Sequence, residues 1–396
     1  MAESKGQLYQ DGKSIGANQL NPHVYERKAL IEARKDQYFG QLASVKAMPK
    51  NSGKEIKLYH YIPLLDDENI NDQGIDATGA TITNGNLYGS SKDIGSIPSK
   101  MPALGETGGR VNRVGFSRKE LSGTFEKFGF FTEYSADLLN FDSDAELLTH
   151  INRELLNGAM ELTEDALQID LINNAGTIRY AGAAMSNAEL GDPNKGGTAD
   201  ASVLTYKDLM AVSIDLDNNR TPKHTTIIKG TRLVDTVTLP SARVAYCGSE
   251  MIPTLESIKD LHGNPAWVPA HKYAAGTTLL NGERGQIGEF RFVIVPEMMK
   301  WNGGGAPATD SKFHATDGKY DVLPILVVGD ESFTTIGFQT DGKTVKFDIT
   351  HKKPGKETAD KTDPYGEMGF ISIKWWYGFM VLRGERIALF KSLAVI

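Results

Sequence analysis

Sulfur chemistry is almost absent from this chain of 396 residues, because it holds one cysteine, Cys247. A single thiol cannot form an intrachain disulfide, and within the apolar segment Arg243–Gly248 we interpret it as a small core residue. No run of about 18 apolar residues predicts a membrane span, and the first residues lack the apolar stretch of a secretory signal. We therefore expect no membrane partner, and either a reducing compartment or a stability that comes from elsewhere.

Recognisable catalytic and ligand-binding motifs are missing as well. The nearest match to a phosphate-binding loop, at residues 12–14, has Gln7 where a glycine is required. Counted from Asp67, the acidic stretch fails the calcium-loop pattern because Asp72 occupies the glycine position, although a loose surface cation site stays open. The eight histidines lack zinc-ligand spacing. We predict no catalytic, cofactor-binding or metal-ligating residue and no enzyme, while a site assembled from distant residues would leave no such motif.

The charge is acidic overall and unevenly distributed. The net charge is −7, yet residues 1–60 carry ten Lys or Arg against six Asp or Glu, whereas residues 61–143 carry seven against twelve. An acidic chain argues against a dedicated nucleic-acid binder. The N-terminal segment remains able to contact a polyanion weakly, and the favoured alternative is a solvated charged helix over 24–40.

The N-terminal part reads as an arm followed by one leg of a hairpin. Residues 1–22 are polar and rich in Gly, Asn and Gln, which is typical of an extended segment. Residues 23–42 predict a surface helix. Its apolar positions are Val24, Ala29, Leu30, Ala33, Phe39 and Leu42. The alternation over 55–63 then predicts a strand.

Residues 66–112 contain few bulky side chains and much Gly, Asn, Asp and Ser. A loop of this length without its own core is either functional or disordered, and burial on another subunit would supply what it lacks. Its apolar residues are more numerous than a free linker needs: Ile70, Ile75, Ile82, Leu87, Tyr88, Ile94 and Ile97. The aromatic segment 113–134 predicts a second strand, so this region resembles a long hairpin with an elaborate tip.

A long helix follows the hairpin. Ser143 and Glu146 form a capping box, and Gly176 stands where a helix should end. The apolar residues between them recur at intervals of three and four: Leu148, Ile151, Leu155, Ala159, Leu162, Ala166 and Ile169. A helix over about 144–175 would be on the order of 45 Å long. One helix of this length in a β-rich chain indicates a structural spine.

The remainder predicts a mixed α+β domain. Residues 181–202 read as a loop and 206–216 as a short helix, after which short β-type segments alternate with turns up to residue 350. The charged stretch 351–366 predicts an exposed hairpin tip. Two strands, over 369–382 and 387–391, close the chain.

This order of elements resembles the HK97-type capsid fold, and more specifically the major capsid proteins of the N4-type phage family. The resemblance runs from about residue 7 to the C-terminus. The stretches that carry it are Leu58–Ala77, Asn86–Ile94, Gly108–Phe116, Glu161–Leu171 and Ile373–Arg383. None of them is a chemical motif, so the similarity is one of overall sequence and order.

The resemblance implies an α+β chain with an N-arm, an extended E-loop hairpin, a P-domain with a spine helix, and a mixed α/β A-domain. The expected boundaries are 1–50 for the N-arm, 51–134 for the E-loop hairpin with its flanking strands, 135–202 and 333–383 for the P-domain, and 203–332 and 384–396 for the A-domain.

The function that the resemblance implies is self-assembly into hexamers and pentamers, which form an icosahedral shell around phage double-stranded DNA. Its partners would be further copies of itself, a separate scaffolding protein, a portal, cement or decoration proteins as further candidates, and DNA through weak non-specific contact. The location would be the virion, after assembly in the host cytoplasm. No Lys or Asn is assigned to a crosslink, so we predict non-covalent shells. The alternatives are a β-rich carbohydrate-active or hydrolytic enzyme and a tail or baseplate adhesin.

Overall fold

The chain forms two units in the computed structural model, one made of residues 1–53 with 124–396 (unit 1) and one of residues 54–123 (unit 2). The structure describes residues 38–42, 44–48, 53–62, 106, 118–141, 147–228, 236–239, 242–273, 280–338, 347–356, 359 and 361–396.

One sheet of unit 1, which we call the long sheet, has the strand order β1-β14-β16-β3, and β15 also pairs with β16. Its strands are β1 (Ser44–Met48), β14 (Phe333–Phe338), β16 (Met368–Val381), β3 (Arg118–Ser135) and β15 (Asp348–Lys352). β1 runs parallel to β14, and the other pairs are antiparallel. β14 pairs with residues 378–381 of β16 and β15 with residues 370–374, along the same edge of that strand. β16 is therefore long enough to hold both partners.

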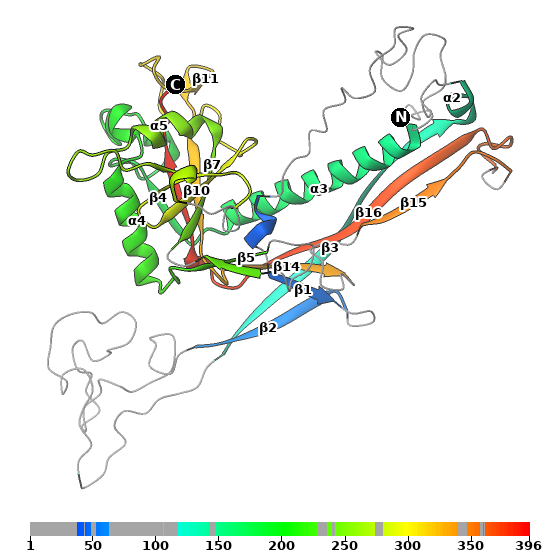
Figure 1. Cartoon of the computed structure of the whole chain (residues 1–396), viewed down its shortest axis with the longest axis horizontal. Coiled ribbons are helices and arrows are strands. Elements are labelled where there is room, and N and C mark those ends of the chain that lie inside the picture. The colour runs from blue at the N-terminus through cyan, green and yellow to red at the C-terminus, as the bar shows by residue number, and fades with distance from the viewer. Residues whose placement is uncertain are drawn as a thin grey trace. The chain divides into compact units, whose positions relative to one another are not determined.

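The spine helix, α3 (Leu147–Asn173), packs on this sheet, as Figure 1 shows. Leu155, Ala159, Leu167 and Leu171 are buried at helical spacing. They share one hydrophobic cluster with Ile371, Ile373, Trp375 and Tyr377, alternate residues that project from one face of β16. The helix is amphipathic over most of its length because its apolar side covers one face of the long sheet.

The second sheet of unit 1 has seven strands in the order β4-β17-β13-β7-β10-β9-β8. Their bounds are β4 (Thr177–Tyr180), β17 (Ile387–Ser392), β13 (Leu323–Val328), β7 (Arg243–Gly248), β10 (Phe290–Val295), β9 (Glu283–Ile287) and β8 (Val268–Pro269). Every residue of β7, β13 and β17 is buried. Cover on both faces explains why these strands read as continuous apolar runs and not as alternating ones.

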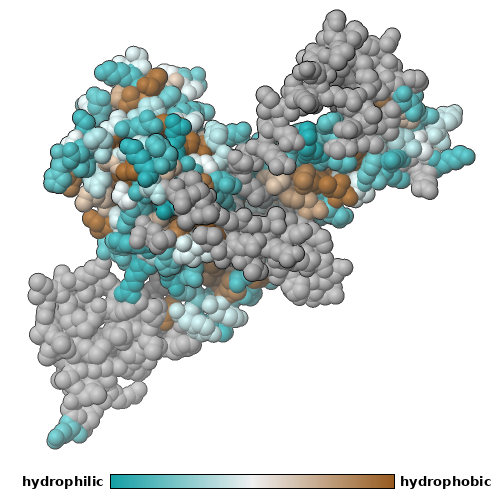
Figure 2. Space-filling view, viewed as in Figure 1, coloured by the Kyte–Doolittle hydropathy of each residue, from teal (hydrophilic) through white to brown (hydrophobic). Residues whose placement is uncertain are grey.

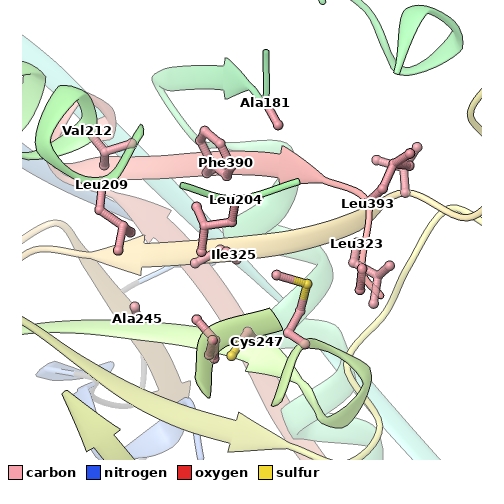
Figure 3. Packing of buried hydrophobic residues seen from close by; sticks show 14 of the residues in the cluster. Ala181, Leu204, Leu209, Val212, Ala245, Cys247, Leu323, Ile325, Phe390 and Leu393 are labelled. Atoms are coloured by element: carbon pink, nitrogen blue, oxygen red, sulfur yellow. The ribbon is translucent and has the colours of Figure 1, made fainter. Parts of the chain in front are cut away.

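The two faces of the seven-stranded sheet belong to different cores. One face, with Ala245, Ile325 and Phe390, shares a hydrophobic cluster with α4 (Tyr206–Asn218) and α5 (Ile252–Ser257). Figure 3 shows these three residues together with Leu209 and Val212 of α4. The other face contributes to the cluster that also holds α3 and the long sheet. That cluster therefore joins both sheets of unit 1 through the spine helix.

Shorter elements complete the described chain. The helices are α2 (Ala136–Phe141), α6 (Ala270–Tyr273) and the 3₁₀ turns η1 (Gly40–Leu42), η2 (Asn187–Glu189), η3 (Asp200–Ser202), η4 (Ser249–Met251) and η5 (Gly384–Arg386). The strands are β2 (Glu55–Tyr61) in unit 2, and β5 (Thr225–Ile228) with β6 (Thr236–Leu239) and β11 (Ala315–Thr316) with β12 (Lys319–Tyr320) in unit 1.

The N-terminal segment and the start of the long helix differ from the sequence predictions or lie outside the described residues. The surface helix predicted up to Leu42 is wrong at its C-terminal end, because residues 40–42 form a 3₁₀ turn and β1 follows, with Phe39 buried in the core. The predicted capping box of the long helix, and most of the predicted hairpin tip at 66–112, lie outside the described residues. Both legs of the hairpin are confirmed as β2 and β3.

Candidate assembly surfaces

The described strands of unit 2 form a two-stranded ribbon, made of β2 and the first residues of β3 (118–123). This ribbon has almost no buried interior. In β2 the exposed residues alternate with half-buried ones, and Tyr59 and Tyr61 are on the exposed side. Among the described residues of this unit, Gly123 alone is buried. A two-stranded hairpin without a packed face is marginally stable in water. The ribbon is thus a surface that gains from burial against something else.

Polar contacts tie the two strands of the ribbon. The Lys57 ammonium lies 2.5 Å from the Glu120 carboxylate, and the Arg118 guanidinium lies 4.2 Å above the Tyr59 ring. The hydrogen bond and charge of Glu120 raise the pKa of Lys57. Contacts this exposed to solvent contribute little to stability. They align the two strands with each other but add little to the stability of the ribbon.

In unit 1, α3 leaves part of its own sheet face uncovered. Phe128 and Phe130 lie opposite Trp375 and Ile373 on neighbouring β16, yet both remain partly exposed. A Cβ built on Gly158 of α3 would lie 3.5 Å from Phe130 Cζ, so this side of the helix faces β3.

The helix continues the same apolar strip. Leu162 and Ile169 are exposed and share the helix side of Gly158, at intervals of four and seven residues. Figure 2 shows hydrophobic surface over the part of unit 1 that holds α3 and the long sheet. Exposed apolar strips of this kind mark contact sites.

The opposite face of the long sheet is more polar. Lys374 lies 3.0 Å from the Asp348 carboxylate across the β15–β16 pair. Phe131, beside Ser372, is 65% exposed on this face. One large exposed aromatic among charges is a candidate contact.

The seven-stranded sheet presents its own apolar spot on α4. Met210 and Ile214 lie one turn apart on the helix face away from the core and are 42% and 58% exposed. The buried side of the same helix holds Leu209, Val212 and Leu216. Arg179 of edge strand β4 forms an ion pair with Asp215 beside them. These two residues form an exposed apolar pair near an edge strand, which is a candidate contact surface.

Within the described ranges, no three His, Cys, Asp or Glu side chains converge as metal ligands. Cys247 is buried, and burial raises the pKa of its thiol far above the ordinary value, which disfavours the thiolate form. In the same part of the chain, no helix has the length and apolar character needed to cross a membrane.

Comparison with known protein sequences shows the family to which the chain belongs. Residues 118–392 match the family described as "Phage capsid protein". The chain is also 59% identical, over 385 residues, to the major capsid protein of Pseudomonas phage KPP21, covering 96% of this chain and 94% of that one. The chain belongs to the phage capsid protein family.

Solved phage capsid proteins share the fold despite very low identity. The capsid of Ralstonia phage GP4 superposes with a TM-score of 0.58 at 11% identity, over 97% of this chain and 98% of that one. The capsid of Helicobacter pylori bacteriophage KHP30 gives 0.54 at 10% identity, over 98% and 100%. The α+β, HK97-type fold expected from the sequence is confirmed, with its extended hairpin, spine helix and mixed α/β domain.

The sequence missed which apolar side chains stay outside. Phe128, Phe130 and Phe131 were assigned to a strand, but alternation places consecutive residues on different faces, and only the position of α3 decides which face is covered. The sequence likewise placed Phe39 on a surface helix. Its one available signal was the Tyr38-Phe39-Gly40 run, two aromatic residues before a glycine.

Proposed function

We propose that this chain is the major capsid protein of a phage, and that it self-assembles into hexamers and pentamers of an icosahedral shell around double-stranded DNA. The observation that carries the proposal is the ribbon of unit 2, whose described residues bury no side chain. Such a ribbon is stabilised when it lies on another copy. The 59% identity to a protein named as a major capsid protein supports the same function.

The tip between the ribbon's strands would complete that contact. Residues 66–112 carry scattered isoleucines and few other bulky side chains, so burial on a neighbour offers what the segment lacks by itself. Deleting residues 70–105 should leave unit 1 folded, with an unchanged thermal midpoint, while the protein no longer forms particles in sedimentation. Normal particles from the deleted chain would refute the role of the tip.

The capsomer ring would form around the A-domain. Copies related by rotation make heterologous contacts, which close a ring when the rotation closes. The exposed Met210 and Ile214 of α4 are suited to one side of such a contact. In this assignment the A-domain comprises 203–332 and 384–396, the P-domain 135–202 and 333–383, the E-loop 51–134 and the N-arm 1–50.

Further partners follow from the same proposal. A separate scaffolding protein, a portal and decoration proteins would act on the shell, and the mildly basic first 60 residues would face packaged DNA through weak contact. We place the protein within the N4-type group, in the virion after assembly in the host cytoplasm, with non-covalent subunit contacts. Nothing in the described residues favours the enzyme or adhesin alternatives.

A further inference from the structure

Residues 38–42 are held against the core of unit 1 by a buried carboxylate. Glu164 of α3 is 7% exposed. Its Oε2 accepts hydrogen bonds from the backbone N–H groups of Tyr38 (3.2 Å) and Phe39 (2.9 Å), and its Oε1 accepts one from Gly40 (3.0 Å). We call residues Tyr38–Leu42 the strap. Charge-assisted bonds to a buried carboxylate are among the stronger hydrogen bonds in proteins.

The strap is held from the seven-stranded sheet as well. The Tyr246 hydroxyl of β7 donates to the Tyr38 carbonyl at 3.0 Å, and its ring lies 4.5 Å from that of Phe39. Burial, together with the charge of Glu164, raises the pKa of Tyr246 well above its ordinary value, so the hydroxyl stays a donor. Gln41 accepts from the Asn281 N–H at 2.9 Å. The strap therefore contacts the spine helix on one side and the seven-stranded sheet on the other.

The chain passes between the seven-stranded sheet and the part of unit 1 that holds α3 and the long sheet in three connections that lie together. They are the α3–β4, β13–β14 and β16–β17 connections. Backbone hydrogen bonds join them: Gly176 N to Gly384 O (3.0 Å), Gly329 N to Arg386 O (3.0 Å) and Leu382 N to Ser332 O (2.9 Å). We call this meeting point the crossover.

The crossover is closely packed but not fully satisfied. A Cβ on Gly176 would lie 2.6 Å from the Gly384 carbonyl, so only glycine permits this approach. The buried Ser332 Oγ, Thr221 Oγ1 and Arg386 Nε have no hydrogen-bond partner among the described residues. Buried polar atoms without partners cost stability, so the crossover is bonded through its backbone but not through all of its side chains.

We propose that the strap is a latch: while it is docked on Glu164 and Tyr246, the two sheets of unit 1 are locked, and its withdrawal frees them to move about the crossover. Withdrawal would take three N–H donors away from a buried carboxylate, one of whose partners, Phe39, belongs to the apolar cluster that both sheets share. Because the strap bonds to α3 on one side and to β7 on the other, an opening that hydrates Glu164 also loosens the contact between those sheets. Strap release and hinge motion are thereby one coupled equilibrium.

The test is hydrogen exchange on the unassembled full-length chain, so it does not depend on the proposed assembly function. Glu164→Gln keeps the shape but replaces one acceptor with an amide that opposes the strap N–H groups. We expect the amides of residues 38–40 to exchange roughly tenfold faster. The amides of Gly176, Gly329 and Leu382 at the crossover should accelerate with them. Glu154→Gln, on the exposed side of the same helix, is the matched control and should change neither set.

Faster exchange at the strap with unchanged crossover amides would overturn the latch, because the strap would then be a local anchor only. Unchanged exchange at residues 38–40 would overturn it too. If Glu164→Gln does not fold, Tyr246→Phe removes the second hold while it keeps the ring that contacts Phe39. The latch requires that this variant also accelerates both sets, and protection of the crossover at the wild-type level would refute it.

Discussion

Ile373 and Phe131 illustrate how position within one sheet decides the importance of a side chain. They lie on adjacent strands but on opposite faces, since Phe131 is paired with Ser372. Ile373 is 1% exposed beneath α3, whereas Phe131 projects into solvent. Their apolar character alone would not distinguish them.

We expect Ile373→Ala to lower the free energy of unfolding by about 2–5 kcal/mol, because it removes buried methyl groups and leaves a cavity under the spine helix. Phe131→Ala should change it by no more than about 0.5 kcal/mol. Chemical denaturation of both variants checks this. Equal effects would mean that α3 does not cover the sheet as described.

His351 gives unit 1 a pH dependence at one residue. Its Nε2 lies 2.5 Å from the Tyr134 hydroxyl, which fits a neutral imidazole whose Nε2 accepts a hydrogen bond from that hydroxyl. Partial burial, followed by the charge of Lys353, lowers the pKa of His351 below its ordinary value of 6.5. The unfolded chain then binds the proton more tightly than the folded one.

The stability that neutral His351 contributes should therefore be fully present above pH 6.5. It should fall as the pH decreases through and below that value. Thermal unfolding of wild type and His351→Gln across this range measures the effect. The variant should show a shallower decline than the wild type. A decline of equal slope in both proteins would place the titrating group elsewhere.

At the scale of elements, α4 shows how a helix is divided between folding and contact. Thr205 caps it through a reciprocal capping box with Asp208, and Leu209, Val212 and Leu216 anchor it to the core. Met210 and Ile214 remain on the outside. The inner residues serve the fold, and the outer pair is available to another copy.

Ile214→Glu should leave the thermal midpoint of the chain within a few degrees, because the side chain is already exposed. Assembly should decrease several-fold, since a buried unpaired carboxylate at a subunit contact is costly. Sedimentation of the assembled fraction measures this, with Ile214→Leu as the apolar control. Full assembly of the Glu variant would remove α4 from the capsomer contact.

At the scale of the whole molecule, the two units differ in how much they can do alone. Unit 1 holds both hydrophobic clusters, whereas the described part of unit 2 holds neither. The described ribbon of unit 2 has no packed core and gains order from partners, whereas two hydrophobic clusters hold unit 1 together.

Limited proteolysis of the unassembled chain should therefore cut first within residues 54–123 and leave a resistant fragment that begins near residue 124. Assembled particles should resist at the same sites, because a neighbour then covers the ribbon. Mass spectrometry of the fragments identifies the cuts. First cuts within the seven-stranded sheet would contradict the division.

Much of the fold was accessible from local pattern. The apolar runs at Phe290–Val295 and Leu323–Val328 predicted strands that the structure shows as β10 and β13. Pattern did not predict that β7 lies between them, because strand neighbours are set by contacts distant in sequence. It also could not pair the strap with Glu164, which lies 125 residues from Phe39.

The sequence by itself determined the kind and order of the elements, the absence of familiar catalytic motifs and the family of the chain. Hydrophobic periodicity is local, so it survives in a single strand or helix read alone. The tertiary structure alone decided which apolar residues remain outside, because exposure depends on what packs over each face. It also decided where a carboxylate belongs in the core: Glu164 is tolerated there because three distant N–H groups meet it.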